Sequence, residues 1–339
     1  MTKEKNLNIK SKIIQKMTTF ELSKKDKDLL FELSLNARAT ITELAKKVKL
    51  SKQLVSYRLN QLEKNKIILG YYAITNIYML GKTHYRVFIK YQNISAEKER
   101  EFMNYLMNNP KIIWIAYFDG DLDAAFLVWA NNIREFEEVF DEINEKFGIY
   151  FQEKMFTIAT SIEYLKYKFL NEKKDINSIT FGNCFNNYSL DQLDKNILND
   201  LNRKGRMTLV ELANKYHSSA KVIKERINKL IQKKIIIGFN LKIDHNRLGY
   251  THRKVLLKLN DNSKDKIKQI SSYLKENKNV IYLIKPIGDY DYEFELMTQS
   301  NEEFHEIIKG LRTKFAQDIK SYNTVIHYEE PKSGQSFNF

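Results

Sequence analysis

The segment ITELAKKVKLSKQLVSYRLNQLEKNKIILG, residues 41–70, is repeated as LVELANKYHSSAKVIKERINKLIQKKIIIG at residues 209–238. The same offset of 168 residues extends without a gap from about residue 22 to residue 158 of the first copy. By direct count, 18 of the 46 positions from Asp26 to Tyr71 are identical to their partners. Solenoid repeats are only roughly 20–50 residues long. The chain therefore carries a whole module twice, and a built-in pseudo-dimer is the first expectation.

Composition favours a globular protein. The 339 residues leave room for two to four domains, and 43% are hydrophobic and 12% aromatic. The longest apolar runs, 112–118 and 124–130, fall well short of the roughly 18 residues that a membrane span needs. A single cysteine, Cys184, allows no internal disulfide, which fits a reducing compartment. We expect a soluble, cytoplasmic protein that uses no membrane.

The net charge of +14 is confined to the first half of each copy. Residues 1–70 hold 16 basic and seven acidic side chains, and residues 186–240 hold 11 and five. Residues 71–170 are instead acidic by three charges. Charge concentrated in the same portion of both copies indicates a surface for a polyanion.

The basic half of copy one is predicted to be a winged helix-turn-helix. Apolar residues of 26–35 recur at helical spacing, Thr40 with Glu43 forms a capping box, and Ser51 is a good N-cap for a third helix. Residues after Lys66 are predicted to form a strand or wing. Three short helices and a closing strand are typical of this DNA-binding motif, whose third helix enters the major groove.

The third helix separates a core face from a polar face. Val55, Leu59 and Leu62 are spaced to face the core, whereas the other side carries Lys52, Gln53, Ser56, Tyr57 and Asn60. Gln and Asn can pair with adenine, and Lys can reach guanine or phosphate. The alternative is that this face is only the solvated side of a core helix.

Copy two keeps the scaffold and changes the exposed face. Ser219 is the equivalent N-cap, and the polar residues are Ala220, Lys221, Lys224, Glu225 and Asn228. Glu225 would repel phosphate unless it accepts a hydrogen bond from cytosine, so we expect the two heads to read different bases. Arg58 and Arg226 are equivalent, and an ion pair with Asp26 and Asp194 is an alternative to a phosphate contact.

The second half of each copy is predicted to be a ferredoxin-like βαββαβ unit. Tyr85, Val87 and Ile89 alternate with Arg86 and Phe88, which indicates a strand. A helix over 97–107, strands over 112–118 and 124–129, a helix over 134–147 and a strand near 154–160 follow. Such a unit has four antiparallel strands with two helices on one face, so the twin unit is the obvious cover for the other face.

These motifs resemble the leucine-responsive/asparagine-synthase regulator (Lrp/AsnC) family over nearly all of both copies. The string Arg-x-(Thr/Ser)-x-x-Glu-Leu-Ala stands at 38–45 and, with Val in between, at 206–213. The recognition-helix pattern stands at Ser51/Val55/Arg58 and Ser219/Ile223/Arg226, and the Gly-Asp-x-Asp turn at 120–123 and 288–291. The first helix starts with Leu190-Asp191-x-x-Asp194 in copy two and with Leu22-Ser23-x-x-Asp26 in copy one.

The resemblance implies a transcription regulator that binds double-stranded promoter DNA and responds to an amino-acid-like effector. Members normally carry one copy and assemble as dimers or larger rings, whereas this chain resembles two fused protomers, with higher homo-oligomers left open. By similarity, an effector site borders the Gly-Asp-x-Asp turns; the alternative is that these are only hairpin turns. The glycine that usually follows the recognition helix is replaced by Lys66 and Lys234, which removes a low-cost left-handed cap.

The expected fold class is α+β, with two copies of a winged helix-turn-helix plus a ferredoxin-like domain. Its divisions are a basic extension 1–21, heads at 22–76 and 190–244, ferredoxin-like ligand and assembly domains at 77–170 and 245–339, and a linker at 171–189. The predicted DNA contacts are Arg38, Ser51, Lys52, Gln53, Ser56, Tyr57, Arg58, Asn60, Arg206, Ser219, Lys221, Lys224, Arg226 and Asn228. The predicted effector contacts are Gly120, Asp121, Asp123, Gly288, Asp289 and Asp291.

Two other functions compete with this interpretation. One is a ligand-sensing or adaptor protein with degenerate DNA binding. The other is an enzyme, because sirohaem decarboxylases have the same two-domain design, sometimes fused. Near the third strand only Tyr117 or Lys285 is available, no convergent His–Arg set is found, and the repeated His84 and His252 fit packing roles better. No phosphate loop, metal-ligand spacing or nucleophile–base pair is present, so we expect no catalytic residues, cofactor or metal site.

Overall fold

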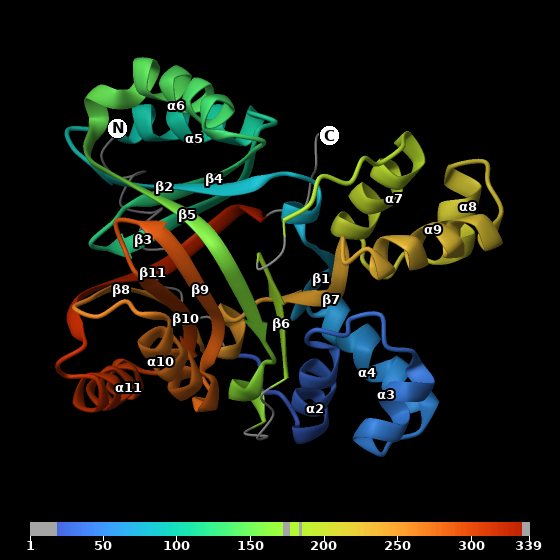
Figure 1. The fold of residues 1–339 in the computed structure, drawn as a ribbon. Helices are drawn as coiled ribbons and strands as arrows, with labels where there is room; N and C mark the ends of the chain where they lie inside the picture. The colour runs from blue at the N-terminus through green and yellow to red at the C-terminus, as the bar shows by residue number, and fades with distance from the viewer. Residues whose placement is uncertain (1–18, 172–176, 183–184, 334–339) are drawn as a thin grey trace, which may run out of the picture.

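The computed structural model describes residues 19–171, 177–182 and 185–333. Two helical heads lie on one side of a strand-rich body, and pairs of helices cover opposite outer faces of that body (Figure 1). The predicted α+β class, with two helix-turn-helix domains and two ferredoxin-like domains, is confirmed. The basic residues of 1–18 and Cys184 lie outside the described residues.

The first head consists of α2 (Lys24–Leu33), α3 (Ile41–Val48) and α4 (Lys52–Lys64), followed by β1 (Ile68–Thr75). The predicted caps are confirmed: Thr40 and Glu43 form a capping box on α3, and the Ser51 hydroxyl accepts the Leu54 amide at 3.2 Å. These side chains satisfy amides that the first helical turn leaves unpaired. They fix where α3 and α4 begin, and hence the turn between them.

The second head repeats this arrangement with α7 (Gln192–Arg203), α8 (Leu209–Lys215), α9 (Ala220–Gln232) and β7 (Ile236–Ile243). Ser219 caps α9 as predicted, through the Val222 amide at 3.2 Å. Lys66 and Lys234, which stand where a glycine is usual, both adopt a left-handed φ of 55°. The backbone keeps its turn although a side chain raises the cost of that conformation.

The two heads are joined through their wings. β1 and β7 pair antiparallel as a two-stranded sheet of their own, with Tyr72 opposite Asn240. These two residues are equivalent in the repeat, so the pairing follows the internal pseudo-symmetry. Arg38 adds a second link, because its Nη1 donates to the carbonyls of Gly205 and Met207 at 2.8 and 3.0 Å. Both heads are therefore held as one unit.

Each ferredoxin-like unit has the predicted element order. Copy one contains β2 (Thr83–Tyr91), α5 (Ala96–Asn108), β3 (Ile112–Gly120), β4 (Ala124–Ala130), α6 (Ile133–Phe147) and β5 (Phe151–Leu165). Copy two contains β8 (Thr251–Leu259), α10 (Lys264–Glu276), β9 (Val280–Gly288), β10 (Tyr292–Thr298), α11 (Asn301–Lys314) and β11 (Ile319–Ser333). Short 3-10 turns lie at Ile77–Met79, Gly148–Tyr150, Lys168–Leu170 and Asn246–Leu248.

The last strand of each unit is longer than predicted and crosses into the other copy. β5 pairs with β2 of its own unit and then with β9, while β11 pairs with β8 and then with β3. The ladder therefore runs β2-β4-β3-β11-β8-β10-β9-β5 and returns to β2. The twin unit does more than cover a sheet face, since the two sheets share edges and close a ring of eight strands. Closure leaves neither unit with an open edge there.

The segment between the copies, predicted as a linker, contains one further strand among its described residues. β6 (Ser178–Phe181) pairs with β5, and Phe181 is buried against the second head. Tyr167 and Phe169, just before this segment, pack into the core of the first head. The connection thus anchors both heads to the ring.

Side chains of the ring strands alternate between two environments. Tyr85, Val87 and Ile89 of β2 pack under α5 and α6, whereas Phe88 belongs to a separate cluster with Leu256 and Val325 from copy two. This second cluster fills one part of the ring interior. No helix within the described residues is long and apolar enough to cross a membrane.

Candidate functional site

The recognition helix α4 displays the side chains predicted to read DNA. Val55, Leu59 and Leu62 are buried beneath it. Lys52, Gln53 and Asn60 are exposed, Ser56 is half-buried, and Tyr57 keeps 61% of its surface exposed. A tyrosine this exposed contributes little to the core, so the face is available to a partner. That these residues contact DNA stays a prediction.

The recognition helix α9 shows a face of the same shape with different chemistry. Ser219, Lys221, Lys224, Glu225 and Asn228 are exposed, over a core of Ile223, Ile227 and Leu230. Glu225 stands where α4 has Tyr57, and Lys224 where it has Ser56. The two heads therefore present different surfaces on one scaffold.

The arginines predicted as DNA contacts have partners within the protein. Arg58 Nη1 lies 3.0 Å from Asp26 Oδ1, and Arg226 Nη1 lies 3.2 Å from Asp194 Oδ1 and contacts Asp191. The ion-pair interpretation of these two arginines is confirmed. Arg38 bonds across to the second head, and Arg206 Nη2 donates to the Ala39 carbonyl at 3.1 Å. DNA contact by these four residues remains untested, but their principal contacts in the protein are structural.

The Gly-Asp-x-Asp turns sit where β3 meets β11 and where β9 meets β5. Asp121 accepts from Asn323 Nδ2 at 3.0 Å, and Asp289 accepts the Phe156 amide at 2.8 Å, so each reaches the other copy. Asp123 accepts the Tyr91 amide at 2.7 Å, and Asp291 the Leu259 amide at 2.8 Å, both within their own copy. The carboxylates that were predicted to bind an effector therefore hold strands together, and their effector role stays a prediction.

A cavity of about 450 Å³ lies between the ring interior and the paired wings. Its lining includes aromatic residues, six consecutive residues from the end of β7 and the turn after it (241–246), and inward side chains of the ring strands. Among those inward side chains are His84, Arg86, Trp129, His252, Lys254, Glu295 and His327. The volume lies within the range of small-molecule sites in proteins. The expectation that no histidines and arginine converge was wrong, because these residues come from strands far apart in the sequence.

Four charged side chains lie buried beside this cavity. Arg86 and Glu293 make a bidentate pair with both N–O distances at 2.7 Å, and Lys254 Nζ lies 3.1 Å from Glu293 and 2.7 Å from Glu295. Burial alone would raise the pKa of the Glu295 carboxyl, but Lys254 and His252 hold that pKa well below its usual value. Glu295 is therefore an ionised carboxylate with Lys254 Nζ beside it.

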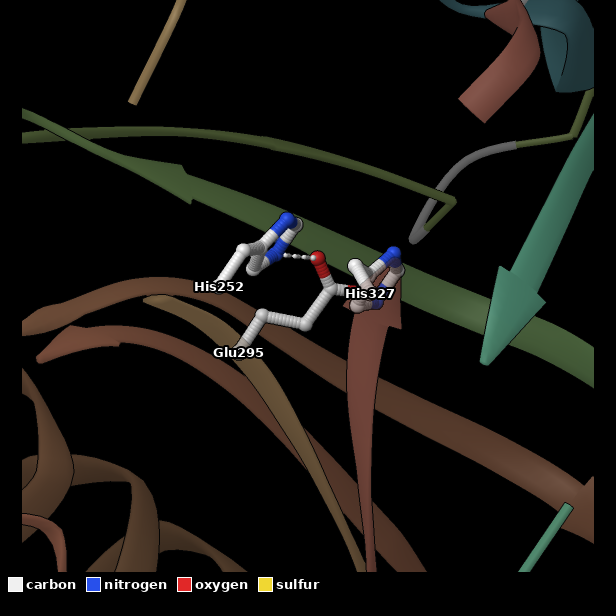
Figure 2. Close-up of side chains that lie close together, drawn as sticks. All are labelled: His252, Glu295 and His327. Atoms are coloured by element: carbon white, nitrogen blue, oxygen red, sulfur yellow. Dashed lines mark hydrogen bonds and ion pairs between the residues drawn. The ribbon is translucent and has the colours of Figure 1, made fainter. Parts of the chain in front are cut away.

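Strands β8, β10 and β11 bring His252, Glu295 and His327 together (Figure 2). His252 Nε2 lies 2.9 Å from Glu295 Oε2, and the two imidazole rings stack with centroids 3.9 Å apart and planes 7° apart. Among the described residues, neither ring nitrogen of buried His327 has a hydrogen-bond partner. Burial and the adjacent His252 lower the pKa of the His327 imidazole, which keeps this ring neutral.

The cluster of His252, Glu295 and His327 belongs to copy two alone. His84 of copy one corresponds to His252, but the positions of Glu293, Glu295 and His327 are taken by Ala125, Leu127 and Ala159. His84 instead contacts Tyr78, Trp129 and Phe181. The pseudo-dimer is therefore symmetric in backbone and asymmetric in the chemistry of its interior.

Comparison with known families agrees with this architecture. Residues 22–68 match a family model described as winged helix-turn-helix DNA-binding, residues 190–231 the AsnC-type helix-turn-helix domain, and residues 254–337 the Lrp/AsnC ligand binding domain. The fold and its motifs thus define a fused pair of helix-turn-helix proteins.

Relatives of known sequence cover one copy at a time. The proline dehydrogenase transcriptional activator of Rhodobacter capsulatus is 31% identical over 118 residues, which are 34% of this chain and 77% of that protein. The regulatory protein AsnC of Haemophilus influenzae is 26% identical over 147 residues, 42% of this chain and 95% of its own. The chain belongs to the Lrp/AsnC family.

A solved structure matches both copies together. The siroheme decarboxylase NirDL superposes with a TM-score of 0.62, covers 94% of each chain and is 14% identical in sequence. At this identity the match shows a shared fold. It confirms that a single chain can hold two such modules in this arrangement.

Proposed function

We propose that the protein is a DNA-binding transcription regulator that works as a single-chain pseudo-dimer. The observation that carries the proposal is the exposed polar face of α4, where Lys52, Gln53, Tyr57 and Asn60 stand free of the core. Lys52 lies at the N-terminal end of the helix. The other charged residues of α4 are Arg58, which is paired with Asp26, and Glu63 and Lys64 in the last turn. A recognition helix enters the major groove with its N-terminal end leading.

The experiment measures binding to duplex DNA by fluorescence anisotropy, using the genomic fragment that the protein enriches most strongly. Replacing Gln53 and Tyr57 with alanine should weaken binding by about 1–3 kcal/mol each if they contact bases. Lys52→Ala should also reduce the slope of log affinity against log salt by about 1, because one phosphate contact is lost.

The matched control is Lys309→Ala. Lys309 lies on α11 with 74% of its side chain exposed, so the variant loses the same charge far from the heads. It should leave the salt slope unchanged. Equal slopes for the two lysine variants, together with unchanged affinity of the Gln53→Ala/Tyr57→Ala protein, would contradict DNA reading by α4. If the natural protein enriches and binds no duplex at all, it would instead be assigned to the class of ligand-sensing adaptors.

We also propose that the regulator responds to a small amino-acid-like effector near the Gly-Asp-x-Asp turns. The support is membership of a family whose matched domain is described as ligand binding. A thermal-shift screen of amino acids should identify it, since a ligand at 100 times its Kd raises stability by about 2.7 kcal/mol. The shift should be lost in Asp121→Ala and Asp289→Ala. A shift that survives both variants would place the effector elsewhere.

The second candidate function is tetrapyrrole decarboxylation, which is favoured by the full-length similarity to NirDL. The charges of the cavity oppose it. Arg86, Lys242 and Lys254 face Asp244, Glu295, Glu329 and Glu330, and both Arg86 and Lys254 already have carboxylate partners. A substrate with several carboxylates needs free cations. Incubation with sirohaem should therefore give no carbon dioxide and no change in the tetrapyrrole spectrum; either change would establish the enzyme.

A further inference from the structure

We infer that His252, Glu295 and His327 bind a divalent transition-metal ion, with an open coordination position facing the cavity. One ligand atom from each residue lies within 4.8 Å of the others, and all three side chains are buried. Zinc bonds to histidine nitrogen and carboxylate oxygen are about 2.0–2.2 Å long. To contact one ion at these bond lengths, the three side chains would rotate toward one another.

The strand pairing explains why these residues meet. β8 lies between β10 and β11, and Lys254 is opposite Glu295 while Arg253 is opposite Ile326. Residues two apart on a strand face the same side, so His252, Glu295 and His327 all point into the ring. The rigid ring therefore holds three donor side chains on adjacent strands.

The donor set suits a borderline-soft divalent ion. Two histidines and one glutamate are the three protein ligands of several catalytic zinc sites, whose fourth position takes water or substrate. Here the three residues line the cavity of about 450 Å³, which supplies that position.

Groups around the three residues match the outer shell of a metal site. Lys254 Nζ bonds the second oxygen of Glu295 at 2.7 Å and so orients the carboxylate. His327 Nδ1 lies 3.3 Å from Glu330 Oε1, an ion-pair distance without hydrogen-bond geometry. Its Nε2 is buried and has no partner in the part of the chain that the structure describes. Ligating histidines commonly have a carboxylate at their other nitrogen. The unpartnered Nε2 is therefore the expected ligand atom.

Copy one shows that folding does not require this cluster. The same positions there hold His84, Leu127 and Ala159, and the unit has the same fold. A buried carboxylate costs free energy unless it is compensated. The polar residues are thus specific to copy two, and the inference stands independently of DNA binding.

The test uses the full chain, free of any purification tag and stripped of metal with a chelator. Titration with Zn²⁺ followed by calorimetry should show one saturable site per chain, and Co²⁺ should give the visible absorption of a protein-bound ion. His327→Ala and Glu295→Leu introduce the residues of copy one and should each weaken binding by more than the roughly 10–100-fold that loss of an outer-shell partner costs. His305→Ala, which removes an exposed imidazole of α11, should leave the site intact.

Two results would overturn the inference: no saturable binding by the natural protein, or equal binding by His327→Ala and Glu295→Leu. If the variants fail to fold, proton spectra of the natural protein with Co²⁺ decide instead. Paramagnetic broadening should affect the ring protons of His252 and His327. Broadening that affects His84 and spares these two would show that the ion binds elsewhere.

Discussion

His84 and His252 occupy equivalent positions in the two copies, yet their surroundings differ in kind. His252 meets a carboxylate and a second imidazole, whereas His84 lies among Tyr78, Trp129 and Phe181. Burial, together with the charge of Arg86, lowers the pKa of His84 to about 3. The same residue type therefore lies in two different environments. Two identical chains would give both histidines the same surroundings.

The buried His84 makes stability depend on pH. Its folded pKa lies below the roughly 6.5 of an unfolded histidine, so its contribution is present above pH 6.5 and is lost as pH falls toward 3. We expect about 2 kcal/mol of unfolding free energy to be lost through this group by pH 5. His84→Phe should flatten the curve measured by urea unfolding between pH 7.5 and 5. An unchanged slope would show that His84 binds its proton equally well in the folded and unfolded protein.

At the scale of single residues, the sequence predicts interactions between neighbours in the chain well and those between residues far apart in the sequence poorly. The caps of Thr40 and Ser51 and the ion pair of Arg58 follow from spacing within one helix or from motif position. The cluster of His252, Glu295 and His327 does not, because its members are 43 and 32 residues apart on three strands. Only the register of the ring brings them together.

At the scale of elements, the two long strands β5 and β11 join the copies. Each runs from its own sheet to a strand of the other copy, where Thr157 pairs with Gly288 and Val325 with Gly120. Both glycines have left-handed φ, 137° and 129°. A Cβ on Gly288 would lie 2.1 Å from the Phe156 carbonyl oxygen, so a side chain cannot fit without moving the strand. The turns of the family motif thus determine how closely the copies pack.

Gly288→Ala should therefore destabilise the protein by about 3 kcal/mol or more, because strained φ and steric overlap add. Gly70→Ala is the matched control: a Cβ added at Gly70 would meet no atom of the described residues within 4 Å, so the effect should stay within about 0.5 kcal/mol. Thermal and urea unfolding of both variants give the comparison. Similar unfolding midpoints of the two variants would show that the contact between β5 and β9 accommodates a side chain at Gly288.

The periodicity of the sequence predicts each element but not how far β5 extends. The predicted strand near 154–160 becomes Phe151–Leu165, because its second half gains hydrogen bonds from β9. The alternation of apolar and polar residues likewise does not predict that β1 pairs with β7. Both depend on contacts between copies, which a pattern within one copy does not contain.

At the scale of the whole molecule, one chain replaces a symmetric dimer and frees its halves to diverge. The backbone retains a pseudo-two-fold arrangement in the wings and in the ring. The recognition faces differ, because Glu225 occupies the position equivalent to Tyr57 and Lys224 the position equivalent to Ser56. Identical heads require matching half-sites, because their two-fold axis maps one half onto the other. Different heads on a two-fold scaffold predict an operator with unlike halves.

Selection of duplexes from a random-sequence pool tests this central claim most directly. The natural protein should enrich a site whose two halves differ, at a half-site spacing set by the fixed heads. A variant in which Lys221, Lys224 and Glu225 are changed to Gln, Ser and Tyr, as in copy one, should shift the enriched site toward a palindrome. Recovery of a perfect palindrome by the natural protein, or no enriched sequence at all, would contradict the account.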